Sequence, residues 1–442
     1  MGTTVNWYRE LQLHERRAFV AAFGGWALDG VDFMMFTFVM STLISLWHID
    51  RAQAGLLGTV TLLVSAAGGW IAGILADRFG RVRVMQWTIL FFSVATMAIG
   101  FAQNFEQIFV LRALQGIGFG GEWAVGSVLM GEIVRGKNRG KAVGTVQSAW
   151  AVGWGCAAIA YTIIYSLLPE QYAWRALFWI GIAPALLVLY IRRNVVEPPA
   201  SARARDAIAR GGERVPFHRI FSPALLKTTF LASLLCTGVQ GGYYAIMIWL
   251  PTFLRIRWHL SVIDTGGYLM VVIVGSFVGY IAGAYLTDWW GRRLNLLVFT
   301  ILSGFCIFFF SHWDITNHQM LILGFPLGFA ASGIYSGLGP FLTELFPAAV
   351  RANGQGFAYS FGRAVGALFP ALVGRLSDSI GLGPAIGAFA LSAYVLVLIA
   401  AALLPETRGQ ELAELGQGDA AGRIPGAGPN ALPLHDVLNG DI

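Results

Sequence analysis

Long apolar stretches, separated by short polar segments, run through almost the whole chain. Twelve of them are long enough to cross the hydrocarbon core of a bilayer as a helix, which takes about 20 residues. They are 18–46, 54–76, 84–103, 107–133, 141–168, 175–191, 224–254, 265–287, 294–312, 319–345, 354–377 and 384–404. The pattern predicts an all-α membrane protein with twelve transmembrane helices.

Composition and charge agree with this reading. The chain is 56% hydrophobic and only 12% charged, whereas a soluble domain has about 25% charged residues. Lys and Arg concentrate in alternate polar segments, beginning at the N-terminus, and the opposite segments hold only Arg51, Arg175, Arg255, Arg257 and Arg375. This bias places both termini in the cytoplasm. We therefore attribute the net charge of +6 to membrane topology and expect no nucleic-acid partner.

The polar segments divide the chain into five parts. We expect a cytoplasmic N-terminus (1–17), a first six-helix bundle (18–192), a cytoplasmic linker (193–223), a second six-helix bundle (224–405) and a Gly-rich, disordered cytoplasmic tail (406–442). The three cysteines lie inside apolar stretches, so neither a disulfide framework nor a metal site is expected. We expect a monomer in a bacterial inner membrane.

The two halves repeat the same landmarks. Ala72–Arg83 follows the second stretch and Ala282–Arg293 follows the eighth, and both carry an Asp shortly before Gly-Arg. A Glu also stands seven residues before an Arg after the fourth stretch and again after the tenth. Such repetition indicates an internal duplication. It predicts two pseudo-symmetric bundles with a binding site between them near the membrane midplane.

Three acids lie inside the apolar stretches of the first half: Asp29, Asp32 and Glu122. A charged Asp at the bilayer centre costs about 2.5–3.5 kcal/mol, so these groups must face protein or a wet cavity. Asp29 and Asp32 are three residues apart and point to the same side of one helix. In a cavity of low dielectric constant such acids can take up and release protons near neutral pH, and we propose them as proton carriers. The alternatives are structural: a salt bridge, a helix cap or a hydrogen bond between packed helices.

Two arginines, Arg363 and Arg112, lie deep inside apolar stretches. A guanidinium binds a carboxylate through two parallel hydrogen bonds, which suits an organic anion. Arg112 lies ten residues outward of Glu122, so coupling or gating is its alternative role. We expect the polar and aromatic lining of the substrate cavity to come from Gln147, Gln240, Tyr243, Tyr244 and Tyr359.

The charged residues of the repeated loops predict a conformational latch, which ties helix ends together in one state and releases them in another. Positive charge that only fixes topology is the alternative for the arginines, but it leaves the acids unexplained. The latch candidates are Asp77, Arg78, Arg81, Glu132, Arg139, Asp288, Glu344 and Arg351.

Three motifs resemble those of the major facilitator superfamily, over residues 18 to about 412. They are Gly73-x-x-x-Asp77-Arg78-x-Gly80-Arg81-x-Arg83, Arg112-x-x-Gln115-Gly116-x-Gly118-x-Gly120-Gly121-Glu122 and Pro405-Glu406-Thr407-Arg408-Gly409-x-Glu411-Leu412. The resemblance implies that family's fold of two six-helix bundles.

Within the superfamily, Asp29-Gly30-x-Asp32 resembles the proton-coupled organic-anion symporters. The segments around Glu122, Trp174 and Arg363 are most similar to the sialate and monocarboxylate group, with the aromatic-acid group next. Bacterial sialate carriers of that group tend to have two extra helices after the sixth, and 193–223 has no apolar run to form them. A smaller carboxylate is therefore favoured.

We expect proton-coupled uptake of a small organic carboxylate by alternating access, driven by the proton gradient without a cofactor. An aromatic-acid symporter or an organic-anion exchanger is the alternative within this class, and a transporter-like membrane receptor is the alternative outside it. Gly116-x-Gly118-x-x-Gly121 matches a dinucleotide motif but lies inside an apolar stretch with no preceding strand, so no nucleotide is expected. No constellation of catalytic residues indicates an enzyme.

Overall fold

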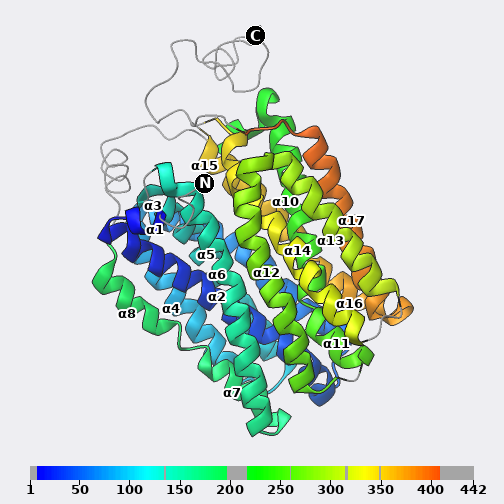
Figure 1. Ribbon diagram of the computed structural model, residues 1–442. Helices are drawn as coiled ribbons and strands as arrows, with labels where there is room; N and C mark the ends of the chain where they lie inside the picture. The colour runs from blue at the N-terminus through cyan, green and yellow to red at the C-terminus, as the bar shows by residue number, and fades with distance from the viewer. Residues whose placement is uncertain are drawn as a thin grey trace, which may run out of the picture.

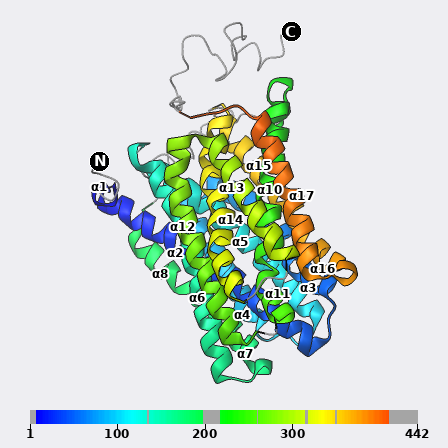
Figure 2. The ribbon, with the colours of Figure 1, turned by 45° about the vertical axis from the view of Figure 1, so that its right-hand side comes forward.

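The computed structural model describes residues 7–133, 136–196, 217–258, 260–313, 317–347 and 350–408. Within these ranges the regular structure is entirely helical, and the long helices stand side by side in two bundles (Figures 1 and 2). Most of the predicted linker and almost all of the predicted tail lie outside the described residues.

The first bundle is formed by the chain up to residue 194. Its helices are α1 (Trp7–Glu10), α2 (Leu13–Trp47), α3 (Arg51–Phe79), α4 (Arg81–Ile99), α5 (Phe105–Ile133), α6 (Gly136–Leu167), α7 (Glu170–Ile180) and α8 (Ala185–Asn194).

The second bundle begins with a short 3₁₀ helix. Its elements are η1 (Phe217–Phe221), α10 (Pro223–Met247), α11 (Leu250–Trp258), α12 (Val262–Trp290), α13 (Arg292–His312), α14 (Asn317–Leu345), α15 (Arg351–Gly366), α16 (Phe369–Ile380) and α17 (Leu382–Leu403).

The twelve predicted spans are present as helices. Eleven helical segments of the described chain are long and apolar enough to cross a membrane, and α5, with 29 residues, takes the place of the remaining span. Three predicted spans are each broken into two helices: α7 and α8, α10 and α11, and α15 and α16. A proline lies at or next to each break, Pro184, Pro251 and Pro370, and a proline cannot donate the backbone hydrogen bond that would continue the helix.

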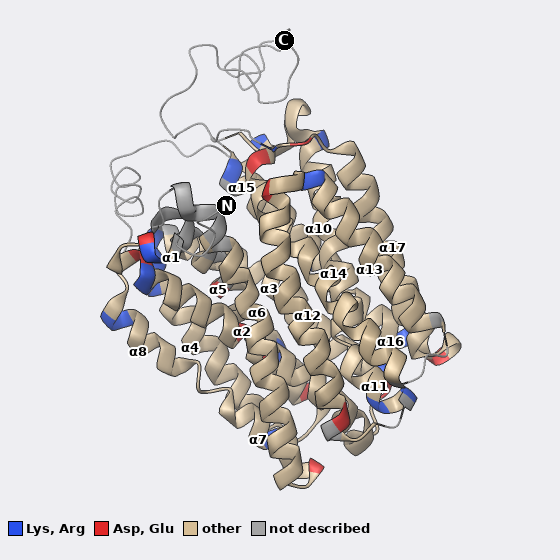
Figure 3. Cartoon of the chain, viewed as in Figure 1, with Lys and Arg blue, Asp and Glu red and all other residues tan. Residues whose placement is uncertain are grey.

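The packing repeats between the bundles. In the first bundle α3 packs on α5 and α2 packs on α6; in the second, α12 packs on α14 and α10 packs on α15. The bundles meet along two further pairs, α6 with α12 and α3 with α16. The architecture is therefore the predicted pair of pseudo-symmetric six-helix bundles. Charged residues gather near the two ends of the molecule and are sparse between them (Figure 3).

The start of α2 and the end of α17 lie at one end of the molecule, and α7 and α11 lie at the other, which we call the distal end (Figure 1). Here Arg255 of α11 crosses to the first bundle. Its Nη2 forms an ion pair with Glu170 Oε1 at 2.7 Å, and its Nη1 donates to Ser41 Oγ at 3.0 Å. Arg51 Nη1 likewise donates to the carbonyl oxygen of Ser377, at 3.3 Å. These contacts hold the bundles together at the distal end.

Glycines permit the closest helix contacts, and substitution of Gly120 of α5 provides a test of this role. A Cβ at Gly120 would collide with the backbone oxygen of Ser65 on α3. We expect Gly120→Ala to lower the free energy of unfolding by roughly 1–3 kcal/mol, because the two helices must separate. The measurement is thermal unfolding in detergent. Gly267→Ala is the matched control, since a Cβ at Gly267 meets nothing within 4 Å. An equal loss in both variants would contradict the close-packing role.

Candidate functional site

The acid of α5 lies against the acids of α2 in the interior of the first bundle. Asp29, Asp32 and Glu122 are 0%, 2% and 1% exposed. A Cβ added at Gly25 would collide with Glu122 Oε1, and Gly25 precedes Asp29 by one helical turn on the same face of α2. The carboxyl groups of Asp29 and Glu122 are accordingly close enough to interact electrostatically. Neither carboxylate oxygen of Asp29 has a hydrogen-bond partner among the described residues.

Asp32 has different neighbours from Asp29. Thr96 Oγ1 of α4 lies 3.1 Å from Asp32 Oδ2, and Gln115 Nε2 of α5 donates to the same Thr96 oxygen at 2.7 Å. Arg112 Nη1 donates to Gln115 Oε1, also at 2.7 Å. A chain of buried polar groups therefore connects the Arg112 guanidinium with the Asp32 carboxyl group.

Arg112 is held inside the first bundle. Its Nε donates to the carbonyl oxygen of Leu57 at 3.3 Å, and its guanidinium carbon lies 4.0 Å from the centroid of the Phe36 ring. The side chain is fully buried. The structure thus brings Arg112 together with the Asp32 network, through Gln115, and Arg363 has a separate set of neighbours.

Arg363 of α15 lies where the two bundles meet. Its Nη2 donates to Tyr359 Oη at 3.2 Å, and its guanidinium carbon lies 5.5 Å from the ring centroid of Phe119, which belongs to α5 of the other bundle. Arg363 is 4% exposed, and its Nε has no hydrogen-bond partner within the described ranges. The guanidinium also acts electrostatically on Asp29. A cation with one unpartnered donor therefore lies within electrostatic range of an acid of the first bundle.

Aromatic and amide side chains surround this cation. Gln240 Nε2 donates to the backbone oxygen of Tyr359 at 2.9 Å, and Tyr244 Oη donates to Gln240 Oε1 at 3.2 Å. Trp150 Nε1 of the first bundle donates to Tyr243 Oη of the second at 2.9 Å. Gln147, the remaining predicted lining residue, is buried three residues before Trp150 on α6. Tyr244, Gln240 and Tyr359 thus lie together beside Arg363, and Tyr243 joins them through its ring contact with Tyr244.

Several residues of this region were not predicted as site residues from the sequence. Tyr335 of α14 packs its ring 5.2 Å from that of Tyr243, and Tyr280 of α12 interacts with the same residue. Thr96 and Gln115 form the chain to Asp32, and Phe119 faces Arg363. In the sequence, the only sign of such a site residue is its polar or aromatic side chain in the middle of an apolar stretch. Many residues with this sign only pack against neighbouring helices.

The predicted latch residues of the second half form a compact charge network. Arg292 at the start of α13 binds Asp288 Oδ1 at 3.0 Å and Glu344 Oε1 at 2.8 Å. Thr407 Oγ1, beyond α17, donates to Glu344 Oε2 at 2.5 Å. The central cation, Arg292, was absent from the predicted set. Arg351 lies apart from these acids, where its Nε donates to the backbone oxygen of Phe346 at 3.3 Å.

The corresponding network of the first half is only partly described. Arg78 places its guanidinium carbon 5.4 Å from the ring centroid of Phe79, and Arg81 begins α4. The side chains of Asp77, Glu132 and Arg139 lie outside the described residues. The latch in this half stays a prediction.

Glu406 ties the chain beyond α17 to the start of α13. Its Oε1 accepts from the backbone N–H groups of Arg292, Thr407 and Arg408, and its Oε2 accepts from that of Arg293, at 2.9–3.0 Å. Partial burial acts to raise the pKa of Glu406, but these backbone donors outweigh it and hold the pKa below its usual range.

The lowered pKa predicts a pH-dependent contribution of Glu406 to stability. We expect Glu406→Gln to lower the unfolding temperature at neutral pH, because the negative charge is lost and an NH2 group, which cannot accept, replaces one of the two acceptor oxygens. The wild type owes this stability to the ionised carboxylate, so the difference should vanish as the pH falls through the lowered pKa. Thermal unfolding from neutral pH to about pH 3 measures it. Glu106→Gln, in the exposed first turn of α5, is the control, and a pH-independent difference would contradict the prediction.

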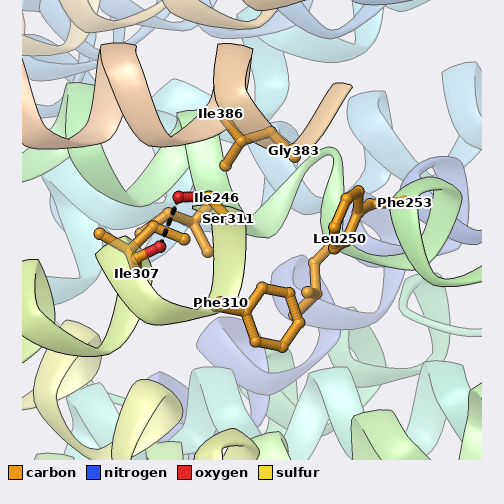
Figure 4. A pocket seen from close by; sticks show the side chains of 8 residues that line it. All are labelled: Ile246, Leu250, Phe253, Ile307, Phe310, Ser311, Gly383 and Ile386. Atoms are coloured by element: carbon orange, nitrogen blue, oxygen red, sulfur yellow. Dashed lines mark hydrogen bonds between the residues drawn. The ribbon is translucent and has the colours of Figure 1, made fainter. Parts of the chain in front are cut away.

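A small hollow at the distal end of the second bundle has a different character. Its lining is apolar apart from Ser311, whose hydroxyl donates to the Ile307 carbonyl oxygen of its own helix at 2.6 Å (Figure 4). The lining residues are Ile246, Leu250, Phe253, Ile307, Phe310, Ser311, Gly383 and Ile386. Without a charged group in its lining, this hollow offers no anchor for an anion.

Two pseudo-symmetric six-helix bundles with a buried arginine where they meet are the architecture of a membrane transporter. The chain matches the sequence profile of the Major Facilitator Superfamily over residues 22–318, and that of the family "Sugar (and other) transporter" over 225–418. The protein belongs to the major facilitator superfamily. It is therefore a multi-pass membrane transporter and not an enzyme.

Two bacterial relatives align over most of the chain. The probable 4-methylmuconolactone transporter of Cupriavidus pinatubonensis is 42% identical over 417 residues, which cover 94% of this chain and 96% of the relative. The cis,cis-muconate transport protein of Acinetobacter baylyi is 32% identical and covers 83% and 89%. Among solved structures, the proton:xylose symporter XylE shares the fold with a TM-score of 0.70, covering 90% of this chain and 98% of XylE, at 16% identity.

Proposed function

We propose that this protein imports a small organic carboxylate together with protons, by alternating access and without a cofactor. The observation that carries the proposal is Arg363, a buried guanidinium at the bundle interface with a spare donor and only neutral hydrogen-bond partners among the described residues. A buried guanidinium without a carboxylate as direct hydrogen-bond partner is costly in the membrane, so an anion bound to it would stabilise it. A guanidinium binds a carboxylate in preference to a neutral molecule.

The side chains around Arg363 suit a small, flat anion. Phe119 and Tyr359 present their rings to the guanidinium, at 5.5 and 5.0 Å. The Tyr359 hydroxyl accepts a hydrogen bond from it, and the Tyr244 hydroxyl and the Gln240 amide are joined by a hydrogen bond beside it, so the surroundings of a bound anion would be polar as well as aromatic. The related transporters named for 4-methylmuconolactone and cis,cis-muconate support a small organic acid as the substrate.

Proton coupling is supported by the pair Asp29 and Glu122. Two ionised carboxylates placed side by side and out of water would repel each other strongly, so one of them holds a proton in this state. The pair then keeps one negative charge, which balances the Arg363 guanidinium. A bound substrate anion adds a further negative charge, and a second proton on the pair would neutralise it. A carrier that holds only the anion or only this proton has an uncompensated charge, which opposes its reorientation.

The membrane orientation follows from the charge bias. The termini and the linker carry most of the Lys and Arg, which supports a cytoplasmic location for them. The bacterial relatives support an inner membrane. In this orientation the distal end, where Arg255 pairs with Glu170 across the two bundles, faces outward.

The experiment is uptake into proteoliposomes under an inward pH gradient. The radiolabelled panel contains cis,cis-muconate, 4-methylmuconolactone, benzoate, lactate and sialate. Accumulation of one member that collapses with a protonophore would support proton-coupled import and identify the substrate class. Exchange of a preloaded member without accumulation under any gradient would overturn the symport proposal in favour of an exchanger.

A further inference from the structure

The buried chain between Asp32 and Arg112 contains two neutral residues with no assigned role. We propose that Thr96 and Gln115 are positioning residues for proton transfer, and that the Thr96 hydroxyl switches its hydrogen bond between Asp32 and the Phe92 carbonyl as Asp32 loses and gains a proton. The proposal rests on the proposed proton coupling only for its effect on transport. The switch itself is a property of the hydrogen bonds.

The orientation of Gln115 is fixed by its neighbour. A guanidinium has only donors, so the atom of Gln115 that faces Arg112 Nη1 at 2.7 Å must be the amide oxygen. The amide nitrogen then points to Thr96 Oγ1, 2.7 Å away, and donates to it. Because Arg112 stays charged, Gln115 keeps this orientation in every protonation state of Asp32.

This orientation leaves the Thr96 hydroxyl with one proton and two acceptors. One lone pair of Oγ1 is occupied by Gln115. The hydroxyl hydrogen can reach Asp32 Oδ2 at 3.1 Å or the Phe92 carbonyl oxygen of its own helix at 2.8 Å, but not both at once. The methyl group of Thr96 lies against Gly181, where an added Cβ would collide with it. The side chain therefore stays in place while its O–H bond rotates.

The two positions correspond to the two states of Asp32. When Asp32 is ionised, the Thr96 hydroxyl donates to Oδ2. When Asp32 is protonated, its own O–H can donate to the second lone pair of Thr96 Oγ1, and the Thr96 hydrogen turns to Phe92. The linked atoms, Asp32 Oδ2, Thr96 Oγ1 and the Gln115 amide, keep a partner in both states, so the proton can come and go without breaking the series of hydrogen bonds. Asp32 Oδ1 and Arg112 Nη2 lie outside this series and have no partner among the described residues.

The hydrogen bonds through Thr96 and Gln115 also explain how Asp32 can take up a proton, and so lose its charge, near the Arg112 cation. Among the described residues, two charged groups act on Asp32: Arg112 from α5 and Asp29, one turn away on α2. The group of α4 that contacts Asp32 is the neutral Thr96 hydroxyl. Direct contact with Arg112 would hold Asp32 ionised at all working pH values. Thr96 and Gln115 keep the guanidinium at a distance and transmit its influence through neutral hydrogen bonds.

The test reads the protonation of Asp32 directly and needs no substrate. Infrared difference spectroscopy of the full-length protein in liposomes follows the carboxyl C=O band during a pH titration, and Asp32→Asn identifies the band. We expect Thr96→Val to raise the titration midpoint of Asp32 by about one pH unit, a tenfold change in proton affinity. The ionised carboxylate loses a donor and the protonated form loses an acceptor, but the hydrogen bond to the charged form is the stronger of the two. Thr96→Ser, which keeps the hydroxyl, should titrate close to the wild type.

Thr88→Val is the matched control. Thr88 lies on the same helix, and its hydroxyl donates to its own backbone, at the Met85 carbonyl. An unshifted Thr96→Val, or an equal shift in Thr88→Val, would overturn the proposal. Should Thr96→Val not fold, Gln115→Met takes its place, with a smaller upward shift expected because Thr96 loses the amide that orients it. An unchanged midpoint there would also overturn it.

The double variant distinguishes one chain from two independent contacts. If the residues act in series, Thr96→Val with Gln115→Met should shift the midpoint no further than Thr96→Val alone. Additive shifts would overturn the serial arrangement. Since no substrate enters the titration, these outcomes are independent of the uptake experiment: failure of the carboxylate panel leaves the switch standing, and failure of the switch leaves the import proposal standing.

Discussion

Arg363→Gln is expected to lower the affinity for the transported carboxylate by about 30-fold to several thousand-fold. Removing one partner of a buried charged pair costs roughly 2–5 kcal/mol, and each 1.4 kcal/mol is a factor of ten. Glutamine can still bond to Tyr359 Oη, so the local packing should survive. The measurement is KM for proton-driven uptake of the panel member that accumulates, with thermal unfolding as the check on folding.

The controls separate the charge from the packing. Arg375→Gln removes an exposed arginine from α16 of the same span and should leave KM unchanged. Tyr359→Phe keeps the ring beside Arg363 but removes the hydroxyl, so a loss of about tenfold or less is expected. Wild-type KM in folded Arg363→Gln would show that the carboxylate binds elsewhere, and Arg112 would be the next buried cation to test.

The hydrophobic pattern was sufficient to predict the helices, because a span must be long and apolar whatever its partners are. It could not show that three spans are broken. A proline inside an apolar stretch can also be accommodated within a helix, as Pro326 and Pro340 are in α14. Whether a proline breaks a helix depends on neighbouring helices, which the sequence does not place.

The acids were found from the sequence, but their separate neighbours were not. Asp29 and Asp32 are predicted on one side of α2, and both are buried. A rotation of about 60° and a rise of about 4.5 Å between them suffice to turn Asp29 toward Glu122 and Asp32 toward Thr96. Which helix meets each acid depends on the packing of α4 and α5 on α2.

The cations illustrate the same limit. From the sequence Arg112 and Arg363 are both arginines in apolar stretches, and they differ only in their expected depth. The structure gives Arg112 three partners inside its own bundle and places Arg363 at the interface, beside Phe119 of the other bundle. Each has one nitrogen without a hydrogen-bond partner among the described residues, Arg112 Nη2 and Arg363 Nε. The sequence analysis used Arg255 only in the count of positive charges that sets the membrane topology, yet its side chain joins the two bundles. Roles of this kind depend on contacts between residues more than 50 positions apart, which a local pattern cannot contain.

Neutralising both members of the acid pair, in Asp29→Asn with Glu122→Gln, is expected to abolish accumulation driven by the pH gradient. A carrier that moves one proton per substrate can accumulate it about tenfold per unit of pH gradient, and without a protonatable group that factor falls to one. Exchange of substrate across the membrane at equal pH should persist, because Arg363 is intact. Both assays use the same proteoliposomes, so folding and insertion are controlled within the experiment.

Asp50→Asn is the matched control for charge removal. Asp50 caps α3, where its Oδ1 accepts from the backbone N–H of Gln53, and asparagine caps a helix equally well. It should accumulate substrate like the wild type. If the double variant still accumulates substrate, the proton held by Asp29 or Glu122 is not the coupled one, and Asp32 with its Thr96 contact becomes the carrier. If exchange is lost as well, the pair helps to bind the substrate or to hold α2 on α5. Only loss of accumulation with exchange retained assigns coupling to the pair, because that result separates the proton from the anion at a site where both are bound.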